Sequence, residues 1–237
     1  SGKYYLTTNV TVTNRAGLTD ADVTLCLNGY TIQAADSYAK ARAFYLRGTS
    51  KLTITDCAAT PGKITGFKAS AIMCDSGCVD AAINIYNIEI SGNANSGAGG
   101  AIVLQGVNKF HLYSGKIIGN TASGNGAAIY MGGTTTAKLL GGEITGNTAK
   151  LGGGAMVYST GSELNVMGAE ITGNTAASGG CLISQTAAVI NLKSGSVSGN
   201  TSTSNGGGIY VSTGTTLNMT GGTVDSNIAA NNGSLKN

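Results

Sequence analysis

Apolar residues recur in three short segments within every stretch of about 27 residues. In the middle segment, one polar or small residue separates two apolar ones. These pairs are Phe110/Leu112, Ala137/Leu139, Leu164/Val166, Ile190/Leu192 and Leu217/Met219. Alternation with period two predicts strands with one buried face, and no window shows the stripe of an amphipathic helix.

Two further signals flank each middle segment. The pattern I-x-G-N recurs with steps of 27, 27, 27, 26 and 27 residues at Asn93, Asn120, Asn147, Asn174, Asn200 and Asn227. Small residues followed by an apolar one give GGAI, GAAI, GGAM, GGCL and GGGI, ending at Ile102, Ile129, Met156, Leu182 and Ile209. Three strands per period predict an all-β fold, a single right-handed parallel β-helix of three sides, because stacked coils bury a core that one coil cannot.

The repeat predicts one domain over residues 1–237 with eight or nine coils. Residues 1–90 are less regular, 91–227 carry the regular repeats, and 228–237 form a polar tail. Leu52/Ile54 and Ile83/Ile85 continue the middle segment toward the N-terminus, with longer excursions near 13–22, 33–42 and 74–82.

The recurring asparagines are expected in tight turns, where Asn tolerates a left-handed backbone, and stacked amides can form a hydrogen-bonded ladder. Chemistry needs a residue once, so six copies favour this structural role. Thr121, Thr148, Thr175 and Thr201 follow in the same turn. Gly99, Gly126, Gly153, Gly179 and Gly206 are expected to supply positive φ at the next corner. A strand follows Gly152–Gly154, whereas a phosphate loop needs a helix there.

Outward positions of the first strand carry the strongest functional signal. If the apolar residue of each GGAI-like motif points inward, the next one points out. That column is Tyr45, Met73, Val103, Tyr130, Val157, Ile183 and Tyr210. It predicts a flat apolar stripe, and exposed stripes of this extent mark contact surfaces. Two alternatives remain open: a loop of the same chain covers the stripe, or the assignment of inward and outward positions is reversed.

The other outward faces are polar. His111, the only histidine, falls on an ordinary solvated face. Glu89, Lys116 and Glu143 should form a ladder of alternating charge. Glu143 and Glu170 would then lie about 5 Å apart, which allows either a weak cation site or a tolerated repulsion. No metal site is assigned.

Composition narrows the function classes. With 11% charged residues and a net charge of +3, the chain lacks the basic character of a nucleic-acid-binding protein. No apolar run is long enough to span a bilayer, and no cofactor motif is present. The sequence begins Ser-Gly-Lys without Met, which suggests part of a larger or processed protein.

Five cysteines leave the compartment open. Cys74 and Cys78 are one candidate disulfide pair, and Cys26 and Cys57 are another. The alternative is that all five cysteines are free thiols, buried or without a role. A CxxxC without a nearby histidine is a poor zinc motif.

The motif Gly99-Gly100-Ala101-Ile102 resembles the GGAI repeat of chlamydial-type polymorphic outer-membrane proteins. Their second hallmark, FxxN, is replaced here by IxGN throughout. The stretches LCLNGYTI and LTITDC also resemble β-helix domains in secreted proteins of anaerobic Gram-positive bacteria. The resemblance implies a bacterial extracellular or cell-surface location and supplies no catalytic residues.

Three function classes follow. The first is a non-enzymatic adhesin, stalk or assembly subunit that binds a protein or glycan, or self-associates through the stripe or open coil ends. The second is a polysaccharide-active enzyme. Against it, Asp20/Asp22, Asp75/Asp80 and Asp225 fall on strands that are not aligned, and no acidic cluster faces Lys40, Arg42, Arg47 and Lys51. The third is ice binding by the threonine column, which lacks a TxT array.

Overall fold

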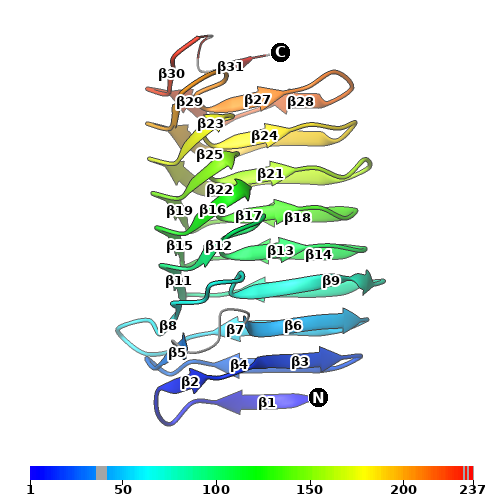
Figure 1. Cartoon of the computed structure of the whole chain (residues 1–237), viewed down its shortest axis with the longest axis vertical. Helices are drawn as coiled ribbons and strands as arrows, with labels where there is room; N and C mark the ends of the chain where they lie inside the picture. The colour runs from blue at the N-terminus through cyan, green and yellow to red at the C-terminus, as the bar shows by residue number, and fades with distance from the viewer. Residues whose placement is uncertain (36–41, 232, 234, 237) are drawn as a thin grey trace.

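The computed structural model describes residues 1–35, 42–231, 233 and 235–236. These residues form a right-handed parallel β-solenoid of about 8 turns, with coils about 27 residues apart and no helix (Figure 1). Every described strand pair is parallel, and the strands fall into three sheets. The predicted fold class is therefore confirmed.

One sheet contains the predicted first strand of each coil and runs along the whole stack. Its members are β3 (Arg15–Thr19), β6 (Arg42–Gly48), β9 (Ile72–Cys78), β13 (Ile102–Leu104), β17 (Ile129–Met131), β21 (Ala155–Val157), β24 (Leu182–Ser184), β27 (Ile209–Val211) and β31 (Leu235–Lys236). We call it the front sheet, after its place in Figure 1.

The largest sheet contains both the predicted middle and third strands, two per coil, and we call it the back sheet. Its middle strands are β1 (Gly2–Tyr5), β4 (Asp22–Cys26), β7 (Lys51–Thr55), β10 (Ala81–Ile85), β14 (Asn108–Leu112), β18 (Thr135–Leu139) and β28 (Thr216–Met219). Its third strands are β2 (Val10–Val12), β5 (Thr31–Ala34), β8 (Lys63–Thr65), β11 (Glu89–Ser91), β15 (Lys116–Ile118), β19 (Glu143–Thr145) and β29 (Thr223–Asp225). In two coils both strands merge, as β22 (Glu163–Thr172) and β25 (Val189–Ser198).

A third sheet occupies the place that was expected to be only a turn. It consists of β12 (Ala94–Asn95), β16 (Thr121–Asn125), β20 (Thr148–Leu151), β23 (Thr175–Ser178), β26 (Thr201–Ser202) and β30 (Ile228–Ala229). Thr121, Thr148, Thr175 and Thr201 are in register on these strands, so their assignment to a turn was wrong. The chain stays extended after each asparagine because its N–H groups bond the preceding coil, as Thr121 N does to Asn93 O at 2.9 Å.

The core is filled by the alternating apolar residues. Phe110, Leu112, Leu164 and Val166 are fully buried, and successive middle strands stack in register at these positions. Burial of such side chains contributes about 1.5–3 kcal/mol each. Every coil repeats the contribution, which makes the stack the source of stability.

The recurring asparagines form the predicted ladder along the inside of the turn. The side-chain amide of Asn120 donates to Oδ1 of Asn147 at 3.0 Å, and the Asn147 amide donates to Asn174 at 3.0 Å. Bonds of the same kind link Asn93 to Asn120, Asn174 to Asn200, and Asn200 to Asn227. The left-handed backbone expected at each asparagine lies one residue earlier in the chain. It belongs to the residue before each asparagine, such as Gly119 at φ 62°, so each asparagine serves through its side chain.

At Gly152–Val157 the strand pairing is shifted by one residue from the predicted register. The left-handed corner glycine of this coil is Gly152, at φ 61°, and not Gly153. Ala155 therefore pairs with Ile129, and Met156 pairs with Tyr130. Val157 pairs with Met131 and is fully buried in the core, so its prediction as an outward contact residue was wrong. The cause is the corner after Asn147, which reaches its left-handed glycine one residue earlier than the corner after Asn120 does.

Candidate functional site

The outward residues of the front sheet align in a column as predicted, but the same chain buries the side chains at its centre. Its paired members are Tyr45, Met73, Val103, Tyr130, Met156, Ile183 and Tyr210. Val103 is 5% exposed, Ile183 1% and Met156 0%. The predicted continuous apolar contact stripe is therefore wrong at its centre, where side chains and backbone of the same chain cover it. Tyr45, Met73, Tyr130 and Tyr210 remain half-buried.

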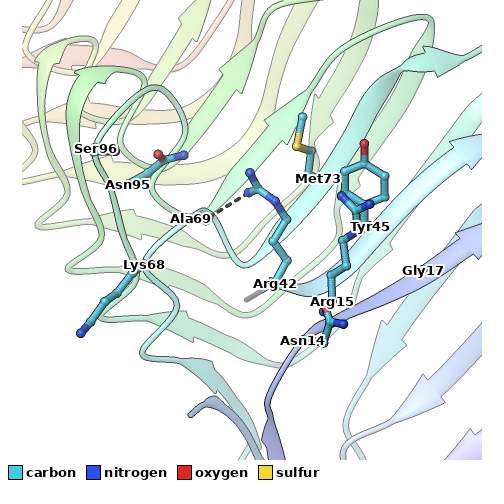
Figure 2. Close-up of a pocket in the computed structure, with 10 residues that line it drawn as sticks. All are labelled: Asn14, Arg15, Gly17, Arg42, Tyr45, Lys68, Ala69, Met73, Asn95 and Ser96. Carbon is cyan, nitrogen blue, oxygen red and sulfur yellow. Dashed lines mark hydrogen bonds between the residues drawn. The ribbon is translucent and has the colours of Figure 1, made fainter. Parts of the chain in front are cut away.

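The N-terminal end of this column opens into a cleft of about 740 Å³ (Figure 2). Tyr45 of β6 and Met73 of β9 line it, together with residues of β3 and the corner before β9. Arg15, Arg42 and Lys68 supply three cationic groups, and no Asp or Glu belongs to the lining among the described residues. Clefts of this volume accommodate small ligands.

The two arginines of the cleft occupy matched positions on adjacent coils, because Arg15 of β3 pairs with Arg42 of β6. The Arg42 side chain extends to the following coil, to the corner before β9. There its Nη1 donates to the Ala69 carbonyl at 2.9 Å and to the Ser70 hydroxyl. The Arg15 guanidinium lies over the Tyr45 ring, with Cζ 4.3 Å from the ring centroid. Among the described residues, Arg15, Arg42 and Lys68 form no ion pair.

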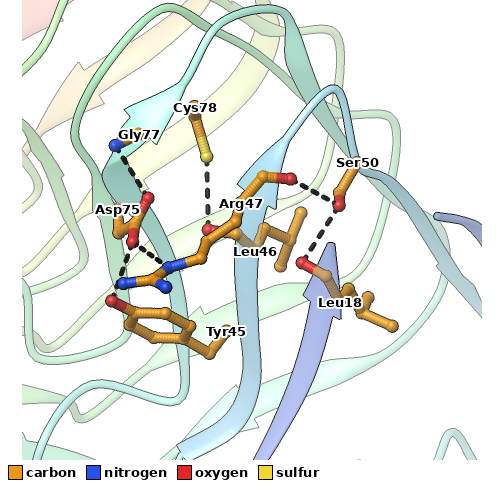
Figure 3. A network of polar contacts seen from close by, with 8 residues as sticks. All are labelled: Leu18, Tyr45, Leu46, Arg47, Ser50, Asp75, Gly77 and Cys78. Carbon is orange, nitrogen blue, oxygen red and sulfur yellow. Dashed lines mark hydrogen bonds and ion pairs between the residues drawn. The ribbon is translucent and has the colours of Figure 1, made fainter. Parts of the chain in front are cut away.

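A buried carboxylate fixes Tyr45 from behind (Figure 3). Asp75, only 6% exposed, accepts a hydrogen bond from the Tyr45 hydroxyl at 2.9 Å. It also accepts from Arg47 Nε at 2.6 Å and from the Gly77 backbone N–H at 2.8 Å. These three donors occupy the carboxylate, so it does not neutralise the cations of the cleft.

Electrostatic shifts follow this arrangement. Burial alone would raise the pKa of Asp75, but the hydrogen bonds from Arg47 and Tyr45 outweigh it and lower that pKa. The hydrogen bond to Asp75 in turn raises the pKa of Arg47. Burial lowers the pKa of Arg42, and the positive charge of Arg15 adds to that shift against the opposing effect of Tyr45. The cleft therefore holds like charges close together.

The predicted basic cluster divides into two places. Lys40 lies outside the described residues, and Arg42 and Arg47 belong to the cleft and its supporting network. Lys51 instead lines a separate depression of about 280 Å³ with Asp20, Asp22 and Asp80. The expectation that the acids are dispersed is wrong for Asp20, Asp22 and Asp80, which line this depression together, whereas Asp75 holds Tyr45 and Asp225 ends β29.

The charge ladder on the third strands is confirmed. Glu89, Lys116, Glu143 and Glu170 are in register. Lys116 pairs with Glu143 at 3.0 Å, and Lys63 adds a pair with Glu89 at 3.1 Å. His111 stands on the middle strand, where its Nδ1 lies 3.0 Å from Asn84 Oδ1, and burial lowers its pKa.

Two cysteine pairs lie close together, and all five thiols are free in this structure. Cys26 Sγ and Cys57 Sγ are 3.3 Å apart on adjacent coils. Cys74 and Cys78 are buried on β9, and the Cys78 thiol donates to the Leu46 carbonyl at 3.2 Å. The hydrogen bond with Cys26 raises the pKa of Cys57. Disulfide formation at either pair remains a prediction.

Sequence reasoning missed the cleft, although one signal pointed to it. Arg15 and Arg42 are separated by one 27-residue period, which places them side by side. Lys68 and the Asp75 network lie in irregular segments, where the repeat gives no register.

Within the described ranges, no group of three or more His, Cys, Asp or Glu residues is placed to hold a metal ion. The same part of the chain contains no helix of the length and apolar character needed to cross a membrane. No protein-family model matches the sequence, and neither curated proteins nor solved structures give a significant match.

Proposed function

We propose that this chain is a non-enzymatic extracellular or cell-surface module of a bacterium, an adhesin, stalk or assembly subunit. It binds a glycan or protein partner by side chains displayed on the solenoid. The observation that carries the proposal is the cleft on β3, β6 and β9, with three cationic side chains that have no carboxylate partner among the described residues. The GGAI-like repeats support a relation to polymorphic outer-membrane protein repeats.

The solenoid suits a display function because its hydrogen bonds hold the surface in one arrangement. Tyr45 is fixed through Asp75, and Arg42 is fixed by the corner at Ala69 and Ser70. A side chain held in place before binding loses less conformational entropy on binding. The covered centre of the apolar column gives no support to self-association through that face.

The test is binding without turnover. Purified protein is applied to glycan and protein arrays, and each ligand that is retained is incubated with it and analysed by mass spectrometry. Retention of at least one ligand, recovered with unchanged mass, is expected. Loss of all binding on both arrays, or cleavage of the retained ligand, would contradict the proposal.

A polysaccharide-active enzyme is the second candidate, and one observation favours it. Asp20, Asp22 and Asp80 surround the depression that also contains Lys51. Asp20 accepts hydrogen bonds from the Thr49 N–H at 2.9 Å and hydroxyl at 3.1 Å, and Asp80 pairs with Lys109 at 2.8 Å. Release of reducing ends or unsaturated sugars from acidic polysaccharides, abolished by Asp22→Asn, would establish this candidate in place of the first.

A further inference from the structure

We propose that the cleft binds an anionic oligosaccharide, with carboxylate or sulfate groups of the sugar held by Arg15, Arg42 and Lys68. The inference rests on the proposed function and names the ligand class of the same site. Three cations line one concave surface, and Asp75, the carboxylate that holds Tyr45, is occupied by three donors of its own.

Arg42 shows most clearly that the described residues supply no carboxylate partner to the cleft. It is partly buried, and among the described residues its Nη1 donates to the neutral oxygens of Ala69 and Ser70. A guanidinium has five N–H donors and binds carboxylate or sulfate with two parallel hydrogen bonds. Burying a cation without an opposite charge is unfavourable, so a bound anion would stabilise the partly buried Arg42 guanidinium.

Arg15 is oriented for the same ligand. Its guanidinium rests on the Tyr45 ring at 4.3 Å, and the Tyr45 hydroxyl is held by Asp75 at 2.9 Å. The aromatic face attracts the cation without neutralising it. Because Arg15 covers this face of Tyr45, the ring orients Arg15 and does not serve as a stacking surface for the sugar there. Tyr45 and Asp75 are thus positioning residues.

The rest of the lining fits sugar hydroxyls better than a peptide. Asn14 and Ser96 are exposed amide and hydroxyl groups at the rim, and Lys68 is also exposed. A peptide recognised by strand addition needs unpaired backbone groups. Of the lining strands, β6 and β9 are paired on both sides and β3 has one free edge at the end of the sheet, so most of this face offers side chains. An anionic sugar with hydroxyls is the ligand that uses both the cations and the rim.

The experiment is a calorimetric titration with four probes. These are an oligogalacturonate, the same oligosaccharide with every carboxyl methyl-esterified, a heparin-derived sulfated oligosaccharide, and an oligoglutamate peptide. We expect binding of the oligogalacturonate, the sulfated oligosaccharide or both, with the stronger of the two identifying the anionic group. Binding should weaken as salt rises, since exposed charges are screened. The esterified sugar and the peptide should bind at least about tenfold more weakly.

The substituted residues are exposed, so the variants should fold like the parent protein. Arg15→Gln and Lys68→Gln should each weaken binding of the anionic sugar about tenfold. Lys193→Gln removes the same charge from an exposed site in a late coil and should leave affinity unchanged. Equal binding of the esterified sugar, tighter binding of the peptide, or unchanged affinity in both cleft variants would overturn the inference. Sugar binding elsewhere on the surface would overturn it while leaving the proposed function standing; cleavage of the sugar would overturn the proposed function itself.

Discussion

The Asn147 side chain links its own coil to both neighbouring coils through its two polar atoms. Its Oδ1 accepts from the Asn120 backbone N–H at 2.9 Å and from the Asn120 amide at 3.0 Å. Its Nδ2 donates to the Ile117 carbonyl at 2.9 Å and to Asn174 at 3.0 Å. Asn147 is fully buried, so water does not replace these bonds when they are lost.

Asn147→Ala should therefore lower the free energy of unfolding by at least about 3 kcal/mol, because it leaves several buried donors and acceptors unpaired. Urea denaturation followed by circular dichroism measures the change. The matched control is Asn218→Ala, since Asn218 also bonds an asparagine one coil away, Asn191 at 2.9 Å, but is exposed. Its loss should be below about 1 kcal/mol. Similar effects of both substitutions would contradict the buried ladder.

Val157 tests the register slip. The side chain is fully buried in the core, whereas Val79 is 62% exposed. Val157→Thr keeps the shape and buries a hydroxyl, and should cost about 1–3 kcal/mol of unfolding free energy. Val79→Thr should be neutral within about 0.5 kcal/mol. If Val157→Thr were also neutral, the outward position first expected for Val157 would have to be reinstated.

Much of the fold is predictable because the chain repeats itself. The middle strands, the charge ladder through Glu89 and Lys116, and the asparagine ladder follow from a constant period and the alternation of apolar residues. The slip at Gly152 does not follow, because three consecutive glycines give no sequence signal for which one turns the chain. The third sheet was missed because its strands are short and rich in threonine, alanine and serine.

The candidate site was less predictable for a different reason. Tyr45 and Met73 were assigned to the correct column, but the groups that give it chemical character come from irregular segments. Arg15 and Lys68 join it through coil stacking, and Asp75 reaches Tyr45 across adjacent strands 30 residues apart. Such contacts depend on the lengths of the excursions, which no repeat specifies.

Asp75 predicts a dependence on pH. Its folded-state pKa lies below the unfolded value, so its contribution to stability is complete above the unfolded pKa of about 3.9 and is lost as pH falls through the lower folded value. Thermal unfolding measured at a series of acidic pH values should show this loss. Asp75→Asn should lower stability at neutral pH and flatten the acid limb. An acid limb of unchanged steepness in Asp75→Asn would contradict the ion-pair network.

Cys26 and Cys57 predict a covalent link between the first coils. The two sulfurs are 3.3 Å apart, and Cys57 is exposed beside the half-buried Cys26, so an oxidant can reach the pair. In the presence of a small-molecule disulfide such as oxidised glutathione, two thiols should form one protein disulfide while the oxidant is reduced to two thiols. Peptide mapping without reductant identifies the linked pair.

The oxidised protein should gain about 3–4 kcal/mol of unfolding free energy, because the link closes a loop of roughly 30 residues in the unfolded chain. The Cys57→Ser variant should show no such gain on oxidation. Oxidised protein that carries the link but unfolds like the reduced form would refute the predicted stabilisation, and absence of the linked peptide would refute the pairing.

The central claim is that a rigid solenoid holds an anionic sugar in the cleft of its first coils. Nuclear magnetic resonance of the isotopically labelled protein during titration with the preferred anionic oligosaccharide tests it most directly. Chemical-shift changes should concentrate at Arg15, Arg42, Tyr45 and Met73 and be absent from the late coils. Changes centred on another face, or no changes at saturating ligand, would contradict the claim.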